Sequence, residues 1–212
     1  MFDDRTDAGN RLGQELLDYQ DAAPLVLAIP KGGIEVAVQV ALTLQADFAI
    51  LVARKLPLPG NPEAGFGAVA EDGSVYLVED ARFALGDDVV TRIIDEQRAE
   101  IQRRIAVLRH GEPMSDLEGR AAILVDDGIA MGSTMRASIR MCRRHNAGRV
   151  VVAAPVASPR TVREMERIAD NVVVLETPRF FQAVAEAYRE WHDVTDAEAL
   201  ESVRRYEQTR RL

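Results

Sequence analysis

Two kinds of hydrophobic pattern alternate along this chain of 212 residues. Short, continuous apolar runs predict buried strands at 24–30, 47–53, 121–125, 148–156 and 171–176. Between them, apolar residues that recur every three or four positions predict helices at 4–20, 34–45, 87–109, 132–145 and 179–190, and a further helix that begins at Pro159 after the N-cap Ser158. Strands that alternate with helices indicate an α/β fold, with a mostly parallel central sheet covered by helices on both faces. Functional loops are then expected at the carboxyl ends of the strands.

One segment interrupts this alternation. Residues 54–73, RKLPLPGNPEAGFGAVAEDG, are rich in proline and glycine and predict a long connection that is mobile at its start. Within it, 66–70 forms a short strand in this prediction, and it pairs with 74–78 as a hairpin across the Glu-Asp-Gly turn. Long connections inside compact domains are often functional lids.

The composition restricts the class of protein. Apolar residues make up 47% and charged residues 28% of the chain, which is typical of a globular protein with a core. The net charge of −8 argues against nucleic acid and anionic membrane as partners, because both attract basic surfaces. Cys142 is the single cysteine, so neither a disulfide framework nor a cysteine-rich zinc site is possible. A polar N-terminus and the lack of a long apolar run predict a cytoplasmic protein that does not span a membrane.

The stretch Ile123–Thr134, ILVDDGIAMGST, combines two carboxylates with small and hydroxyl residues. Glycines allow a close approach of the backbone to a ligand, and Ser133 and Thr134 can donate hydrogen bonds and cap the helix that follows. The start of that helix favours a phosphate. The acids Asp126 and Asp127 repel a phosphate and instead need donors, which sugar hydroxyls or a hydrated Mg²⁺ supply. A sugar 5-phosphate satisfies both halves of the stretch.

Two further predicted strand ends carry basic residues. One is Pro30-Lys31-Gly32-Gly33 and the other is Arg54-Lys55. Taken alone, Arg54-Lys55 is typical of a basic pair that faces water, and Lys31 also fits a surface lysine in a tight turn. The acidic pair alone is equally typical of a solvated strand end beside a capped helix. Three rival motifs fail. The order of acids and lysines does not fit a phosphoacceptor receiver domain. The P-loop motif GxxxxGK[ST] is absent, which excludes a P-loop NTPase. Gly65-x-Gly67-x-x-Ala70 does not open a helix after a strand, as a dinucleotide fingerprint does.

Together, these motifs resemble type I phosphoribosyltransferases. ILVDDGIAMGST is similar to the family's binding motif for 5-phosphoribosyl-1-pyrophosphate, IPKGG to its pyrophosphate loop, and ARK with the proline- and glycine-rich segment to its catalytic lid. From DRTDAG through RKLPLPGNPE to its C-terminal end, the chain resembles a bacterial subgroup whose acceptor is unassigned. The resemblance implies a single domain over 1–212, with a core at about 21–176, a lid at about 56–73, and a hood from 1–20, from 177–212 or from both.

The resemblance also implies a role for each motif. Asp126 and Asp127 hold the ribose 2- and 3-hydroxyls, directly or through the waters of Mg²⁺. Lys31 and the amides of Gly32 and Gly33 hold pyrophosphate, at a place where the family often has a non-proline cis peptide. Arg54 and Lys55 neutralise the leaving pyrophosphate. The 5-phosphate cradle comprises Gly128, Ile129, Ala130, Met131, Gly132, Ser133 and Thr134.

The implied activity belongs to nucleotide metabolism. A homodimeric, Mg²⁺-dependent enzyme transfers the 5-phosphoribosyl group to a small nitrogenous acceptor and releases pyrophosphate. Ala130 replaces the aspartate of the 6-oxopurine enzymes, which argues against a hypoxanthine or guanine acceptor, and Met131 replaces a common threonine. The alternative is a non-catalytic regulatory sensor that binds 5-phosphoribosyl-1-pyrophosphate or a nucleotide. Of the aromatic residues near the C-terminus, Phe180, Phe181, Tyr188 and Trp191, most are expected to pack in the core, while Trp191 is also a candidate to stack on an acceptor base.

Overall fold

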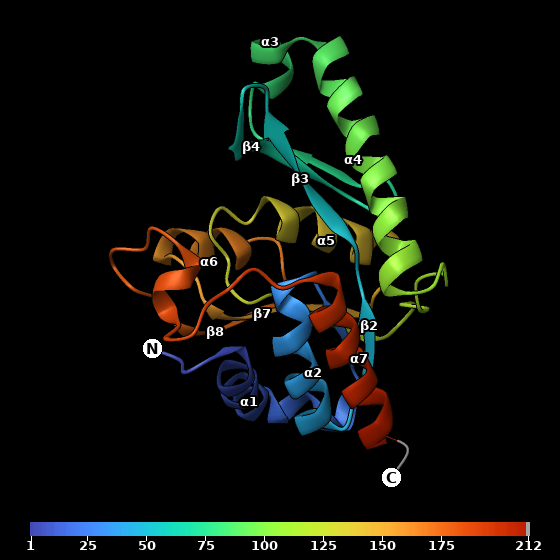
Figure 1. The fold of residues 1–212 in the computed structure, drawn as a ribbon, viewed down its shortest axis with the longest axis vertical. Helices are drawn as coiled ribbons and strands as arrows, with labels where there is room; N and C mark the ends of the chain where they lie inside the picture. The colour runs from blue at the N-terminus through green and yellow to red at the C-terminus, as the bar shows by residue number, and fades with distance from the viewer. Residues whose placement is uncertain (211–212) are drawn as a thin grey trace.

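The computed structural model describes residues 1–210 and contains a five-stranded parallel sheet (Figure 1). Every neighbouring pair of its strands is parallel, as the alternating pattern predicts. The strands lie in the order β2-β1-β6-β7-β8, which leaves the carboxyl ends of β1 and β6 adjacent. Their bounds are β1 Leu25–Ala28, β2 Asp47–Ile50, β6 Ala121–Val125, β7 Arg149–Val156 and β8 Asn171–Glu176.

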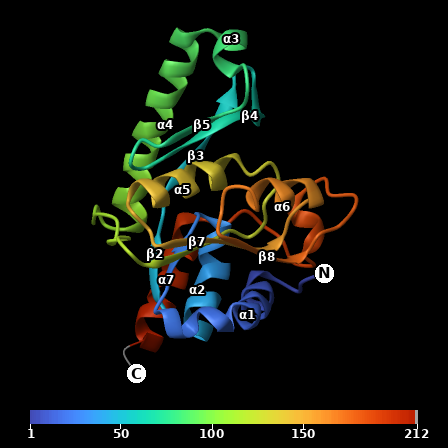
Figure 2. The same cartoon turned by 180° about the vertical axis from the view of Figure 1, so that it is seen from behind.

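Helices cover both faces of this sheet (Figures 1 and 2). α1 (Arg5–Glu15), α2 (Gly32–Leu44) and α7 (Asp196–Arg210) lie on one face, and α5 (Ser133–Arg144) and α6 (Pro159–Met165) lie on the other. Successive side chains of each strand point to opposite faces, so the sheet has one hydrophobic core on each face. On β1, for example, Val26 packs with the apolar residues of α2, while Leu25 and Leu27 pack with those of α5. The α/β prediction is therefore confirmed, with both faces of the sheet buried.

A second, antiparallel sheet projects from the first (Figure 1). It consists of β3 (Ala53–Leu58), β4 (Asn61–Ala70) and β5 (Val75–Leu77), and α3 (Ala81–Leu85) and α4 (Asp87–Leu108) follow it. The predicted hairpin between 66–70 and 74–78 is confirmed by the β4–β5 pairing. The prediction of an irregular connection is wrong over most of 54–65, which forms β3 and the first half of β4. Pro57 lies at a shift in the β3–β4 register, where a strand tolerates a residue that lacks an amide hydrogen.

A buried ion pair fastens the junction between the two sheets. Arg109, directly after α4, donates to Glu71 Oε1 at 3.0 Å and to the carbonyl oxygen of Ile50 at 2.9 Å. Glu71 in turn accepts from the backbone amide of Val52 at 2.9 Å. The two charged side chains are only 10% and 7% exposed. The end of β2, the turn after β4 and the end of α4 are thus held at one point.

The terminal regions differ from the sequence predictions. The predicted helix 4–20 ends at Glu15 and continues as a 3-10 helix over Leu17–Ala22. The predicted helix 179–190 is wrong, because this region contains only the 3-10 turn Val184–Ala187. The last helix is instead α7, which was not predicted. None of the helices within residues 1–210 is long and apolar enough to cross a membrane.

Candidate functional site

The acidic stretch lies at the carboxyl end of β6, as the pattern of the sequence predicts. Asp126 and Asp127 follow the last residue of the strand, and the loop that follows them is held from two sides. The amide of Ile129 donates to the carbonyl oxygen of Val156 at 2.9 Å, and the hydroxyl of Thr161 donates to the carbonyl oxygen of Ala130 at 2.6 Å. β7 and α6 therefore fix the shape of the loop.

Helix α5 begins at the end of this loop without a side-chain cap. Its N-cap residue is Gly132, with φ of 73°, and no side chain accepts a hydrogen bond from the first-turn amides. The prediction that Ser133 or Thr134 caps the helix is therefore wrong, because both already lie within its first turn. Uncapped amides at the start of a helix carry partial positive charge and favour an anion.

A pocket of about 250 Å³ lies in front of these amides. On one side it is lined by Asp126 and by the loop that leads into α5. On the other side it is lined by Lys55, Glu63 and Gly65 of the β3–β4 hairpin, where the Lys55 ammonium donates to the carbonyl oxygen of Glu63 at 2.7 Å. The structure thus brings together Lys55 and Asp126 with the predicted cradle residues Gly128, Ile129, Ala130, Met131, Gly132, Ser133 and Thr134.

Arg54 does not line this pocket, although its neighbour Lys55 does. Successive residues of a strand point to opposite faces, and the Arg54 Nε donates instead to Oε1 of Gln97 on α4 at 3.1 Å. Burial lowers the pKa of Arg54, and the nearby charges of Arg104 and Arg103 lower it further. Arg54 therefore faces α4 and its arginines.

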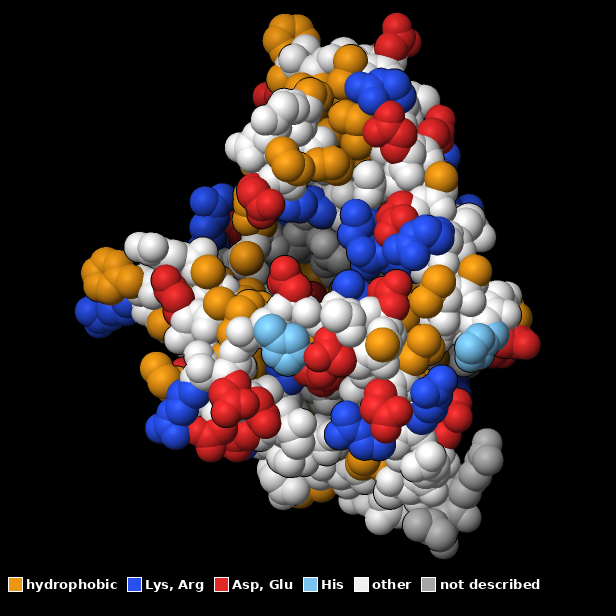
Figure 3. Space-filling model, in the orientation of Figure 1, with side chains coloured by type: hydrophobic (Ala, Val, Ile, Leu, Met, Phe, Trp, Pro, Cys, Tyr) orange, Lys and Arg blue, Asp and Glu red, His pale blue; other side chains and the backbone are white. Residues whose placement is uncertain are grey.

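Lys31 lies beside the same arginines. Its Nζ is 3.7 Å from one carboxylate oxygen of Asp196, and Arg103 approaches the other oxygen at 3.8 Å. We call the group Lys31, Arg54, Arg103 and Arg104 the basic cluster. Figure 3 shows a hollow between the projecting sheet and the main body, bordered by lysine, arginine and acidic side chains.

The Pro30-Lys31-Gly32-Gly33 turn brings the start of α2 against the acidic pair. The Pro30–Lys31 peptide bond is cis, which confirms the prediction for this position. A Cβ atom on Gly32 would lie 1.8 Å from Oδ2 of Asp127, and one on Gly33 would lie 2.9 Å from the carbonyl oxygen of Val125. No larger side chain fits at either glycine without displacing β6 or its acids.

The structure adds Arg5 to the predicted site. Its Nε donates to Oδ2 of Asp127 at 2.8 Å, and its Nη1 donates to the carbonyl oxygen of His192 at 3.0 Å. The guanidinium carbon lies 4.0 Å from the ring centre of Trp191, so Arg5 occupies one face of the aromatic ring proposed for base stacking. The only sequence signal for Arg5 was its position in the DRTDAG stretch that contributed to the family resemblance.

The two acids differ in their surroundings. Burial raises the pKa of Asp126, and the adjacent charge of Asp127 raises it further. Burial also raises the pKa of Asp127, but Arg5 opposes that shift. Within residues 1–210, Asp126 forms no ion pair, and its carboxylate accepts from the amide of Asp127 at 2.9 Å. Tyr188 completes the surroundings of the pair by donating its hydroxyl to the carbonyl oxygen of Asp127 at 2.6 Å.

Comparison with known proteins gives concordant matches. A sequence model of the phosphoribosyl transferase domain family matches residues 4–189. A relative from Mycobacterium tuberculosis H37Rv, provisionally named a phosphoribosyl transferase, is 42% identical over 94% of this chain. The chain spans only 46% of the length of that relative. A ribose-phosphate pyrophosphokinase of Shewanella oneidensis is 30% identical over 60% of the chain and 38% of its own length.

Among solved structures, the crystal structure of TT1426 from Thermus thermophilus matches the fold closely. It is 35% identical, covers 97% of this chain and 99% of its own, and superposes with a TM-score of 0.82. The match extends over the projecting sheet and both terminal regions as well as the central sheet, since almost all of both chains is covered.

Proposed function

Because the chain belongs to the phosphoribosyl transferase domain family, we propose that it transfers the 5-phosphoribosyl group from 5-phosphoribosyl-1-pyrophosphate to a small nitrogenous acceptor. The reaction releases pyrophosphate. The observation that carries the proposal is the 250 Å³ pocket, in which an uncapped helix start, a carboxylate and a lysine face one another. A sugar phosphate needs all three, since its phosphate seeks amides and cations while its hydroxyls seek acceptors.

In this proposal the 5-phosphate lies at the start of α5. It accepts hydrogen bonds from the first-turn amides and from the hydroxyls of Ser133 and Thr134. Asp126 accepts from the ribose hydroxyls, because this residue lines the pocket and its carboxylate lacks a cationic partner within the described chain. Asp127 has a different part, since its Oδ2 is held by Arg5 and lies against Gly32. It fixes the start of α2 beside the ribose.

The leaving pyrophosphate is assigned to Lys55 and the basic cluster. When the bond between C1 of ribose and the pyrophosphate oxygen breaks, the electron pair leaves with pyrophosphate, and positive charge develops on C1 and the ring oxygen. Lys55, together with Lys31 and the amides of Gly32 and Gly33, stabilises the departing negative charge. Arg54 contributes to the potential of the same hollow from its position against α4. The nitrogen acceptor then bonds to C1 from the opposite face, and its proton passes to solvent.

The acids suit a magnesium ion that is shared with the substrate. Within residues 1–210 no group of three or more acidic, histidine or cysteine residues could hold a metal. Magnesium bound to phosphorylated substrates needs only one or two protein carboxylates, and Asp126, buried and without a cationic partner, supplies one. Asp127 is the second candidate. When bound, Mg²⁺ neutralises phosphate charge.

The β3–β4 hairpin is the proposed lid. Lys55, Glu63 and Gly65 already form one wall of the pocket, so a small movement of the hairpin changes its width. Closure excludes water, which would otherwise hydrolyse the activated sugar. The hood around the acceptor is proposed to come from 1–20, from 177–212 or from both, where residues 211 and 212 lie outside the described residues. The family resemblance leads us to expect a homodimer.

Two features favour the alternative of a regulatory sensor. The Asp127 carboxylate is already bonded to Arg5, and the exposed side chain of Met131 offers the phosphate no hydroxyl. Such a protein binds 5-phosphoribosyl-1-pyrophosphate or a nucleotide without turnover. Lys55 and the basic cluster favour the enzyme, because a sensor binds the intact sugar and has less need to stabilise a departing pyrophosphate.

The deciding experiment measures pyrophosphate release. The protein is incubated with Mg²⁺, 5-phosphoribosyl-1-pyrophosphate and a panel of purine, pyrimidine and other nitrogenous acceptors. Release that depends on one acceptor supports the transferase and identifies the reaction. Tight binding of 5-phosphoribosyl-1-pyrophosphate without release for any acceptor supports the sensor. Failure to bind the sugar at all contradicts both.

A further inference from the structure

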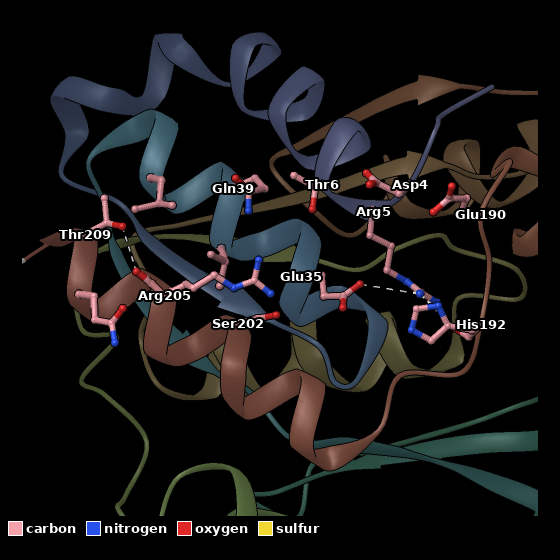
Figure 4. Close-up of a pocket in the computed structure, with 13 residues that line it drawn as sticks. Asp4, Arg5, Thr6, Glu35, Gln39, Glu190, His192, Ser202, Arg205 and Thr209 are labelled. Carbon is pink, nitrogen blue, oxygen red and sulfur yellow. Dashed lines mark hydrogen bonds and ion pairs between the residues drawn. The ribbon is translucent and has the colours of Figure 1, made fainter.

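A second cavity, separate from the proposed sugar pocket, lies between α1, α2 and α7 (Figure 4). Its volume is about 420 Å³, and it shares none of the residues of the acidic loop. Val38 and Leu42 give it an apolar portion, while most of its remaining lining is polar or charged. Figure 4 shows Glu35 and Gln39 of α2 on one wall and Arg205 of α7 reaching toward them from the other.

Glu35 is a carboxylate without hydrogen-bond donors. In the described part of the chain it accepts no hydrogen bond, and its nearest cationic atom is Nη1 of Arg5, at 3.8 Å. Its side chain is 21% exposed. Burial raises the pKa of Glu35, and the charges of Arg5, His192 and Arg205 partly offset this effect. A carboxylate withdrawn from water gains when a ligand supplies donors.

Arg205 is an unpaired cation on the facing wall. Its side chain forms no ion pair or hydrogen bond with residues 1–210. Two other arginines on the same helix do find acids, since Arg204 lies 3.8 Å from Glu201 and Arg210 lies 3.3 Å from Asp47. The guanidinium of Arg205 is therefore available, and its planar donors suit a carboxylate.

The cavity thus has an acidic end and a basic end. Asp4 and Glu190 line the cavity at the end away from Arg205, together with Arg5 and His192, and Gln39 lies one turn along α2 from Glu35 (Figure 4). No phenylalanine, tyrosine or tryptophan of the described chain lines it, so a heteroaromatic ring would lack a stacking partner. A ligand with one positive and one negative group meets this arrangement better than a nucleobase.

We propose that this cavity is a second ligand site, for a small zwitterion of the α-amino acid type. The ammonium group of the ligand donates to Glu35, and its carboxylate accepts from Arg205. The ligand's side chain lies along Val38 and Leu42. Arg5 forms part of the wall of this site and also donates a hydrogen bond to Asp127. The guanidinium of Arg5 therefore lies between the bound zwitterion and the acidic pair.

The test is direct binding to the full chain, measured by calorimetry with each of the common L-α-amino acids as probe. At least one is expected to bind, while its amide, which lacks the carboxylate, and its N-acetyl form, which lacks the ammonium, each bind at least about tenfold more weakly. Adenine and hypoxanthine are measured in parallel. This measurement needs no sugar phosphate, so its result is independent of the proposed transferase activity.

Two variants locate the binding. Glu35→Gln and Arg205→Gln should each weaken binding by about tenfold or more, because each removes one charge-assisted contact. Arg204→Gln, a neighbour on α7 outside the cavity, should leave it unchanged. The proposal is overturned if no free amino acid binds, if the blocked forms bind equally well, if a nucleobase binds instead, or if either cavity variant retains full affinity.

Discussion

The Nε of Arg5 lies 2.8 Å from Oδ2 of Asp127, across 122 residues of sequence. A basic side chain from the first helix therefore contacts one of the two acids at the end of β6. The same carboxylate oxygen lies 1.8 Å from the position that a Cβ on Gly32 would take, so Asp127 also contacts the start of α2. Asp126, in contrast, lines the 250 Å³ pocket. The two adjacent acids thus have different surroundings, since Asp126 lines the pocket while Asp127 contacts α1 and the start of α2.

Asp126→Asn should stabilise the protein and weaken its binding of the sugar. Above the folded pKa of Asp126, the variant removes a charge that burial and the neighbouring Asp127 both disfavour, and the asparagine oxygen can still accept from the Asp127 amide. We expect the free energy of unfolding to rise by about 0.5–2 kcal/mol, and the affinity for 5-phosphoribosyl-1-pyrophosphate to fall about tenfold or more. Urea unfolding and calorimetry measure the two effects. Asp193→Asn, on an exposed loop, serves as the control, and a variant less stable than the original protein would contradict the prediction.

The stabilisation by Asp126→Asn should depend on pH. The pKa of Asp126 is raised in the folded state, so between the unfolded value of about 3.9 and the folded value the native protein binds more protons than the unfolded chain. The unfolding free energy of the original protein therefore falls as pH rises through that interval. The advantage of the variant should be full above the folded pKa and should vanish below about pH 4. An advantage independent of pH would exclude charge burial as its cause.

Arg5 and Asp127 should be coupled in stability. Arg5→Met removes the cation from a pair whose side chains are 5% and 15% exposed, and it leaves the acid uncompensated. The expected loss is about 3–5 kcal/mol, and Asp127→Asn in the same background should cost much less than it does alone. A double-mutant cycle in urea measures the coupling. Arg11→Met, whose pair with Asp7 is on the surface of the same helix, should cost no more than about 1 kcal/mol. Additive losses for Arg5 and Asp127 would show that the contact carries no energy.

Gly32→Ala should disturb this pair by steric overlap. The new methyl group would lie 1.8 Å from Oδ2 of Asp127 and 2.9 Å from Nε of Arg5, so the carboxylate must move. Overpacking of this kind costs about 1–3 kcal/mol. Asp127→Ala should relieve the overlap, so the double variant should be more stable than the sum of the single losses predicts. If the two losses simply add, the clash is absent and the helix start has shifted instead.

Much of the central sheet could be predicted because its three inner strands are buried on both faces and the edge strand β8 is a continuous apolar run that is partly buried. The runs at 121–125 and 171–176 coincide with β6 and β8 in every residue. The strand β3 was missed because it contains a proline and is followed in sequence by further prolines and glycines. In addition, β3 is only partly buried, so its sequence lacks a continuous apolar run. Helix α7 was missed for a similar reason, since only Ala199, Ser202 and Tyr206 on it are buried. Its start did carry a signal, because Thr195 and Glu198 form reciprocal capping bonds.

The pocket could be predicted more completely than the contacts around it. Lys55 and the 128–134 loop meet because parallel strands end at one edge and the hairpin folds back over that edge. The position of Arg5 depends on how α1 packs against α2, which no local pattern encodes. The aromatic residues near the C-terminus show the same limit. Tyr188 is buried as expected, whereas Phe180 is 90% exposed and does not pack in the core.

Arg109→Met should strongly destabilise the junction between the two sheets. The pair with Glu71 is almost completely buried, and Arg109 also bonds to the backbone of β2. Loss of one partner from such a pair costs about 3–5 kcal/mol. Arg98→Gln on the preceding helix breaks only an exposed pair with Asp95 and should cost less than about 1 kcal/mol. Equal losses for the two variants, measured by urea unfolding, would contradict the role of Arg109 as a clamp.

Lys55 and Arg54 are adjacent, and they should differ in their effect on binding. Lys55 and Asp126 both line the pocket, whereas Arg54 donates to Gln97 on the opposite face of β3. Lys55→Gln should therefore weaken binding of 5-phosphoribosyl-1-pyrophosphate by about tenfold or more, since a charge-assisted contact to phosphate is lost. Arg54→Gln removes only a more distant charge and should weaken it by less than about threefold at moderate salt. Calorimetry in Mg²⁺ buffer measures both affinities, and urea unfolding confirms that each variant is folded. A larger loss for Arg54→Gln would show that the pyrophosphate lies on the α4 side of the hairpin, and the pocket assignment would then be wrong.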